Sequence, residues 1–112
     1  MLIEKYRIED FKGGWFIGNF EPSLLKTNEF ECSIKVYSKG EIWDKHYHKI
    51  AKEYNYVFKG IVEVNGEEYK EGDIFVVNPG CVVDPIFKED CTICCIKTPC
   101  VIGDKYNVER DV

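Results

Sequence analysis

The sequence predicts an all-β fold, and three observations lead to that prediction. Apolar and polar residues alternate over short runs, β-branched and aromatic residues recur along the chain, and turn-forming residues separate the runs. Almost no segment repeats at the period of a helix. With 112 residues, the chain is expected to form one domain, residues 1–112, with a single modest core.

The expected strands follow one another at short intervals, and each is rich in β-branched or aromatic residues. In chain order they are Gly14–Phe20, Glu31–Tyr37, His46–His48, Glu53–Lys59, Ile61–Val64, Glu67–Tyr69, Ile74–Val77, Pro85–Phe87 and Cys91–Ile96. Turn signals fall between them at Lys39-Gly40, Asn65-Gly66, Glu71-Gly72-Asp73, Asn78-Pro79-Gly80 and Lys88-Glu89-Asp90.

One of these turns is more specific than the others. Asn65-Gly66 lies between IVEV and EEYK, and both central residues of a type I′ turn need positive φ, which Asn and Gly tolerate best. A tight hairpin is therefore expected there. Residues 21–28 are expected to hold a short helical turn, and the tail after Pro99 to be irregular.

Composition and charge exclude several classes of partner. The chain has 45% hydrophobic and 31% charged residues, which is typical of a globular protein. Its net charge of −5 argues against nucleic acid and against an anionic membrane, because no basic stripe is present. No run is long enough for a transmembrane helix, and the first residues, Met-Leu-Ile-Glu-Lys-Tyr-Arg, do not read as a signal peptide. A cytoplasmic location is expected.

The six cysteines have the spacing of a strand rather than of zinc knuckles. Five of them follow Cys32, at positions 81, 91, 94, 95 and 100, and Cys91-x2-Cys94 overlaps Cys95-x4-Cys100 in one extended segment. Reduced cysteines packed as small apolar residues are expected. A metal or redox role is the alternative.

The only two histidines lie one residue apart, in the pattern G-x5-H-x-H-x4-E-x6-G formed by Gly40, His46, His48, Glu53 and Gly60. Side chains alternate along a strand, so both imidazoles should point to the same side. If the next strand folds back beside them, Glu53 completes three ligands of the kind that iron, manganese, nickel, zinc or copper accepts. Taken alone, the pair fits a polar surface stretch without a ligand better than a metal site.

The strand after the histidines has two different faces. Glu53 and Asn55 share the face that suits a partly polar pocket inside a small barrel. Tyr54, Tyr56 and Phe58 form the opposite, aromatic face, which needs cover from a second sheet or from another subunit. The sequence therefore allows a homodimer, although sheet-on-sheet packing explains the same pattern.

These residues resemble a known family, the cupins. Residues 40–60 match the first cupin motif, G-x5-H-x-H-x3-4-E-x6-G, and residues 72–87 resemble a degraded second motif that begins with Gly72 and contains Gly80. The resemblance implies a jelly-roll-like double-stranded β-helix, a small barrel that binds a divalent metal ion (iron, manganese, nickel or zinc). His46, His48 and Glu53 are then the candidate ligands.

The second motif departs from the family pattern in one important place. Val83 stands where the family has its next ligand histidine, so the usual four-ligand set cannot form. Asp84 is the candidate substitute, but strand alternation turns it away from the side of Val83 unless a β-bulge corrects the phase. A rim aspartate that caps backbone amides is the alternative.

Two further stretches, Gly13–Ser23 and Gly103–Tyr106, look like those of small cupins associated with sugars and surface polysaccharides. Sugar-nucleotide ketoisomerases, a neighbouring cupin group, carry a similar His-x-His-Lys run and use histidines as acid and base without metal. Three functions are thus open. The first is a metal-dependent enzyme, such as an isomerase, epimerase or oxygenase, that acts on a small polar metabolite such as a sugar or nucleotide-sugar, with Tyr37 or Asn55 orienting it.

The second function is a metal-free isomerase or epimerase in which His46 and His48 act as catalytic acid and base, which suits side chains that titrate near neutral pH. The third is a binding or sensing module without catalysis. In each case the expected partner is a small molecule.

Overall fold

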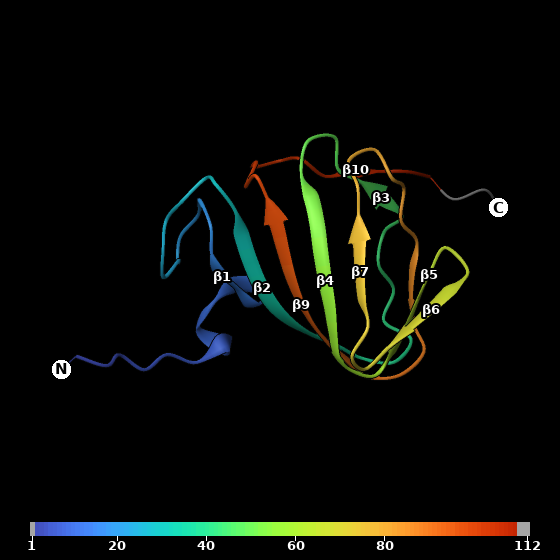
Figure 1. Ribbon diagram of the computed structural model, residues 1–112, viewed down its shortest axis with the longest axis horizontal. Helices are drawn as coiled ribbons and strands as arrows, with labels where there is room; N and C mark the ends of the chain where they lie inside the picture. Colours follow the sequence, from blue (N-terminus) through green and yellow to red (C-terminus); the bar gives the residue numbers. More distant parts are fainter. Residues whose placement is uncertain (1, 110–112) are drawn as a thin grey trace.

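Two antiparallel sheets and a short strand pair make up the fold in the computed structural model, which describes residues 2–109. The larger sheet, in the order β1-β2-β9-β4-β7, forms one curved layer (Figure 1). The smaller sheet has the order β6-β5-β8, and β10 pairs with β3. The elements are η1 (Ile8–Asp10) and η2 (Lys12–Gly14), both short 3-10 turns, β1 (Trp15–Ile17), β2 (Glu31–Tyr37), β3 (His46–Tyr47), β4 (Lys52–Lys59), β5 (Ile61–Val64), β6 (Glu67–Lys70), β7 (Ile74–Val77), β8 (Pro85–Phe87), β9 (Cys91–Thr98) and β10 (Tyr106–Asn107).

Strand β9 lies between β2 and β4 and pairs with both. Its register places Cys95 beside Ser33 of β2 and Asn55 of β4, and places Lys97 between two carboxylate residues, Glu31 and Glu53. Because side chains alternate along each strand and the two rows are two residues apart on β2, β4 and β9, both rows lie on the same face. The inner face, toward the smaller sheet, carries the polar residues that form the candidate site.

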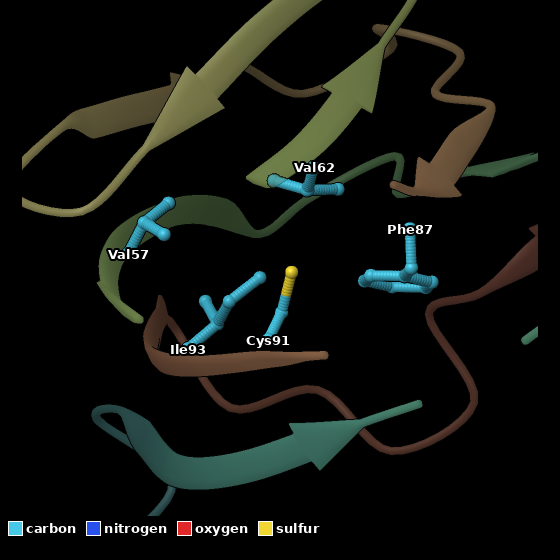
Figure 2. Packing of buried hydrophobic residues seen from close by; sticks show 5 residues of the cluster. All are labelled: Val57, Val62, Phe87, Cys91 and Ile93. Carbon is cyan, nitrogen blue, oxygen red and sulfur yellow. The ribbon is translucent and has the colours of Figure 1, made fainter. Parts of the chain in front are cut away.

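The hydrophobic core lies where the two sheets meet. Figure 2 shows its buried cluster, in which side chains from β4, β5, β8 and β9 point toward one another: Val57, Val62, Phe87, Cys91 and Ile93. Tyr37 extends this cluster, with its ring stacked on Phe87 at a centroid distance of 4.2 Å. The candidate site lies next to this core, because Val62, Phe87 and Ile93 also line its cavity.

The outer face of the larger sheet is apolar and exposed. Tyr54, Tyr56 and Phe58 are 38%, 40% and 64% exposed, so the smaller sheet does not cover them. The rows are continuous across the strands, because Tyr54 lies beside Ile96 and Val76, and Tyr56 beside Cys94 and Ile74. We call this surface the outer face; it comprises Ile34, Val36, Tyr54, Tyr56, Phe58, Ile74, Val76, Cys94 and Ile96.

The structure confirms the all-β class and most of the expected strands. Glu31–Tyr37, Ile61–Val64, Ile74–Val77 and Pro85–Phe87 have the predicted bounds. The Asn65-Gly66 hairpin is also confirmed, with φ of 53° and 86°.

Three local predictions were wrong. Residues 21–28 hold no helical turn, because the amide of Leu24 donates to Phe16 O at 2.8 Å and Ser23 Oγ accepts the amide of Gly18 at 3.1 Å, which ties the segment to β1. The first strand is consequently shorter than Gly14–Phe20. The tail contains a strand, β10, that pairs with β3.

Four of the six cysteines pack as buried small residues, as their spacing predicts: Cys32, Cys91, Cys95 and Cys100 are buried, whereas Cys94 is partly exposed and Cys81 is exposed. All six are free thiols, and β9 runs through the cysteine-rich segment, with Cys91 and Cys95 buried. Burial raises the pKa of both thiols, which favours the neutral form. Among residues 2–109 no helix has the length and hydropathy needed to cross a bilayer.

Candidate active site

A cavity of about 220 Å³ lies on the inner face of the larger sheet, next to the core. Five of the six side chains that the sequence singles out line it: Tyr37, His46, His48, Glu53 and Asn55. They come from β2, from β3 and the residue after it, and from β4. The strand alternation that placed both histidines on one side is thus consistent with the structure.

The two imidazoles lie edge to face, with ring centroids 5.3 Å apart and an interplanar angle of 79°. His46 is held by backbone pairing, since its amide donates to Val83 O at 3.0 Å and its carbonyl accepts the amide of Val83 at 2.8 Å. Its Nδ1 lies 2.7 Å from Asp44 O, and Nδ1 of His48 contacts Asp104 O. A carbonyl only accepts, so each Nδ1 carries a proton, and the chemistry falls to the two Nε2 atoms, of which that of His48 contacts Glu53.

Asp104 is a buried residue that fixes the loop behind His48. Its carboxylate accepts the backbone amides of Lys49, Ile50 and Ala51 at 2.9, 3.1 and 2.9 Å. Burial alone raises the pKa of Asp104, but these hydrogen bonds outweigh it and hold the pKa below its usual value. The sequence reading noted Gly103–Tyr106 only as a family likeness and gave Asp104 no role.

Glu53 connects His48 to the next strand. Its Oε2 lies 3.3 Å from His48 Nε2, and its Oε1 accepts a hydrogen bond from Asn55 Nδ2 at 3.0 Å. Burial acts to raise the pKa of Glu53, but the bonds from His48 and Asn55 and the charge of Lys97 lower it overall. The carboxylate is therefore ionised at neutral pH.

The two histidines have pKa values that shift in opposite directions. The hydrogen bond to Glu53 raises the pKa of His48 against the effect of burial. Burial lowers the pKa of His46, and the charges of Lys105 and His48 lower it further. One cavity thus holds an imidazole with a lowered pKa beside one with a raised pKa, which is the arrangement that suits a base and acid pair.

Three lysines also line this cavity, and the sequence reading missed them: Lys35, Lys97 and Lys105. Lys35 lies two residues from Tyr37 on the same face of β2, and Lys97 lies two residues from Cys95 on β9. Lysine is seldom turned inward. The alternation that marked Tyr37 as inward-facing also marks Lys35, so this signal was present in the sequence.

Asp84 does not join the other predicted residues. It lines a separate depression with Gly40, Glu41 and Ile42, and its amide donates to Asn65 Oδ1 at 3.0 Å. Val83, which is 7% exposed, lines the candidate site instead. Val83 and Asp84 thus line different depressions, as strand alternation predicts when no β-bulge intervenes.

A divalent ion needs several side-chain donors arranged around one point. The 3.3 Å between His48 Nε2 and Glu53 Oε2 suits two ligands of one ion. In the described part of the chain, however, no three His, Cys, Asp or Glu side chains have such an arrangement, and three lysines share the cavity. The side chains as placed therefore do not fit a complete metal site, and the ligand set stays a prediction.

Comparisons with known proteins place the fold. No family model matches the chain, and no curated protein matches it either. Among solved structures, a conserved Klebsiella pneumoniae protein with a double-stranded β-helix domain superposes with a TM-score of 0.69 at 20% identity, over 95% of this chain and 92% of the other.

Two further structures share the fold over a smaller part of the chain. KdgF from Halomonas sp. has a TM-score of 0.58 at 23% identity, over 65% of this chain and 72% of its own. A sugar phosphate isomerase of the cupin superfamily from Silicibacter pomeroyi has a TM-score of 0.56 at 17% identity, over 74% and 59%. The chain therefore has the cupin fold, a small double-stranded β-helix domain, and proteins of this fold include enzymes.

Proposed function

We propose that the cavity is the active site of a cupin enzyme that moves a proton within a small polar metabolite of the sugar type, as an isomerase or epimerase. The observation that carries this proposal is the pairing of His46 and His48 in one cavity wall, each fixed through Nδ1 and one of them held by Glu53. Similarity of fold alone does not fix a reaction.

The proposed chemistry balances without a cofactor. Nε2 of His46 takes a proton from the carbon beside a carbonyl, and the C–H electron pair forms an enediol while the carbonyl oxygen receives a proton from Nε2 of His48. For the isomer, His46 returns its proton to the former carbonyl carbon, and the hydroxyl proton on the other enediol carbon passes to Nε2 of His48 as the new carbonyl forms. For the epimer, the proton returns to the opposite face of the carbon that lost it, and His48 takes back the proton from the original carbonyl oxygen. Glu53 stabilises the protonated form of His48 between turnovers.

Exchange of substrate hydrogen with solvent tests this proposal. Metal-stripped protein is incubated in deuterated water with aldoses, ketoses, sugar phosphates and sugar acids, and deuterium incorporation is followed by NMR. We expect exchange in at least one substrate, and a loss of about 100-fold or more in His46→Gln and His48→Gln. Tyr47→Phe, which changes a residue not lining the cavity, is the control. Exchange that disappears on chelation and returns with a divalent ion would overturn the metal-free mechanism.

A metal-dependent enzyme is the second candidate, and one observation favours it. Both Nδ1 atoms are tied to backbone carbonyls, which is how metal-ligating histidines are commonly oriented. Metal analysis after reloading with iron, manganese, nickel or zinc separates the two candidates. Stoichiometric binding that is abolished by His46→Gln supports the metal site, whereas ligand binding without any turnover supports a sensing module.

We also propose that a second copy of this chain covers the outer face. The eight apolar residues with large exposure on this face present on the order of 700 Å² if each exposes about half of its surface. That area exceeds the apolar patches of most monomers and approaches the roughly 800 Å² per partner of a standard interface. Among the residues that β4 contributes to this side of the sheet, Lys52, Tyr54, Tyr56 and Phe58, only Lys52 is charged, and it lies at the start of the strand.

Light scattering after size-exclusion chromatography checks this assembly. We expect a dimer for the native chain and a monomer for Phe58→Glu, because the new carboxylate would be buried without a partner. Ile102→Glu changes an exposed apolar residue away from the sheet and is the matched control. A native chain that is monomeric at about 100 μM would refute the proposal.

A further inference from the structure

The candidate active site concentrates positive charge in a protein that is negative overall. Three lysines, Lys35, Lys97 and Lys105, line the cavity, whereas Glu53 is the single carboxylate residue in its lining. The whole chain carries a net charge of −5. The net positive charge of this cavity is therefore opposite in sign to the net charge of the chain. Such a cavity raises the local concentration of anions.

The ammonium groups share two indole rings. Lys35 Nζ lies 4.6 Å from the ring centroid of Trp43 and 5.6 Å from that of Trp15. Lys105 approaches Trp43 at 5.2 Å, and Lys97 approaches Trp15 at 4.8 Å. The three cations are thus gathered around two aromatic rings, which hold the charges in place by cation–π attraction.

Carboxylates neutralise only part of this cluster. Lys97 Nζ pairs with Glu31 Oε1 at 2.9 Å. For Lys35 Nζ, in contrast, no carboxylate oxygen of residues 2–109 lies within ion-pair distance. Burial lowers the pKa of Lys35, and the charges of Lys105 and Lys97 lower it further. These neighbours repel one another, and an anion placed among them would relieve that repulsion.

An unpartnered hydroxyl lies in the same lining. Ser33 is 0% exposed, and its Oγ has no hydrogen-bond partner within the described residues. It is two residues from Lys35 on the inner face of β2 and lines the cavity. Buried polar atoms are usually hydrogen-bonded, so this donor marks a place for a ligand acceptor.

We propose that Lys35, Lys97, Lys105 and Ser33 bind an anionic group, a carboxylate or phosphate, on the small molecule that occupies this cavity. The inference rests on the proposed function in taking the cavity as the substrate site. At about 220 Å³ the cavity is smaller than the roughly 300–1,000 Å³ of most ligand pockets. An anionic single sugar fits this space better than a complete nucleotide-sugar.

Tryptophan fluorescence provides the test, because the only two tryptophans of the chain both line the cavity. The native chain is titrated with inorganic phosphate, glucose 6-phosphate, glucuronate and glucose at low ionic strength. We expect the anionic sugars to bind at least about tenfold more tightly than glucose, and Lys35→Met to raise their Kd by about tenfold or more. Preference for glucuronate or for glucose 6-phosphate identifies the carboxylate or the phosphate.

Lys39→Met is the matched control, because Lys39 is exposed and does not line the cavity. Its Kd values should stay within about twofold of those of the native chain. Lys35→Met should unfold at the same or a higher temperature, since it removes a repelled charge, so a loss of binding is not a loss of folding. Equal binding of glucose and glucuronate, no anion binding up to about 10 mM, or unchanged Kd values in Lys35→Met would each overturn the inference.

His46→Gln separates this inference from the proposed reaction. That variant should still bind the anionic sugars, because the lysines and Ser33 are intact. Anion binding without hydrogen exchange in the native chain supports the binding site and refutes the isomerase. Exchange on neutral sugars alone supports the isomerase and refutes the anion site.

Discussion

Replacing Asp104 by alanine is expected to destabilise the fold, because one carboxylate accepts three backbone amides. The amide of Ala51 is the most costly to leave without a partner: Ala51 is 4% exposed, so water cannot replace the carboxylate. Leaving a buried donor unsatisfied costs about 1–3 kcal/mol. Lys49 and Ile50 are exposed and can be rehydrated, so each of those bonds contributes about 0.5–1.5 kcal/mol. The total is about 2–6 kcal/mol, with a centre near 4 kcal/mol, which lowers Tm by roughly 15–30 °C.

Urea unfolding followed by tryptophan fluorescence measures this loss, and Asp104→Asn is the control. An asparagine oxygen can keep the amides of Ile50 and Ala51, so the control should lose only about 1 kcal/mol. The pKa of Asp104 is lowered in the fold, so its charge stabilises above the unfolded pKa of about 3.9, and that contribution is lost as pH falls through the folded pKa. An alanine variant within about 1 kcal/mol of the native chain at pH 7 would refute the reasoning.

Three other perturbations follow from the same structure. Glu53→Gln should lower the pKa of His48, and NMR titration of the two histidines measures this change. In the native chain the Glu53–His48 pair stabilises the fold at pH values between the lowered pKa of Glu53 and the raised pKa of His48. Its contribution is therefore lost as pH falls through the pKa of Glu53 and as pH rises through the pKa of His48. An unchanged His48 titration would contradict this. Gly60→Ala should cost at least about 2 kcal/mol more than Gly66→Ala in urea unfolding: both glycines have positive φ, but a Cβ at Gly60 would lie 2.2 Å from a backbone oxygen, whereas the one at Gly66 meets open space. Equal losses would show that only φ matters. Val57→Ala should cost about 2–3 kcal/mol by the same method, because Val57 is 0% exposed, and a loss below about 0.5 kcal/mol would argue against the packing in Figure 2.

Periodicity in the sequence predicted which side chains meet, because a strand's faces follow directly from alternation. His46, His48, Glu53 and Asn55 reach one cavity for that reason. The same rule anticipated that Asp84 would turn away from the side of Val83, and the fold subsequently placed it outside the cavity.

Contacts between distant segments could not be predicted in this way. Asp104 lies 56 residues after His48 in the sequence and stabilises the loop that follows His48, and no local sequence pattern predicts that contact. Residues 21–28 have the composition of a helical turn, yet tertiary hydrogen bonds to β1 determine their conformation. Lys35 was missed for a different reason: alternation marked its position, but lysine is ordinarily assigned to solvent.

The central position of β9 has a consequence for how the chain reaches its native state. Lys97 pairs with Glu31 on one side and Glu53 on the other, so the two halves of the larger sheet are joined only through this late strand (Figure 1). During synthesis, the edges of β2 and β4 that pair with β9 stay without hydrogen-bond partners until β9 has been made. Pairing between strands so far apart in the sequence is intrinsically slow. Ribosome-bound chains that end before Cys91 should therefore be captured by chaperones and cleaved by proteases far more readily than chains released after Thr98.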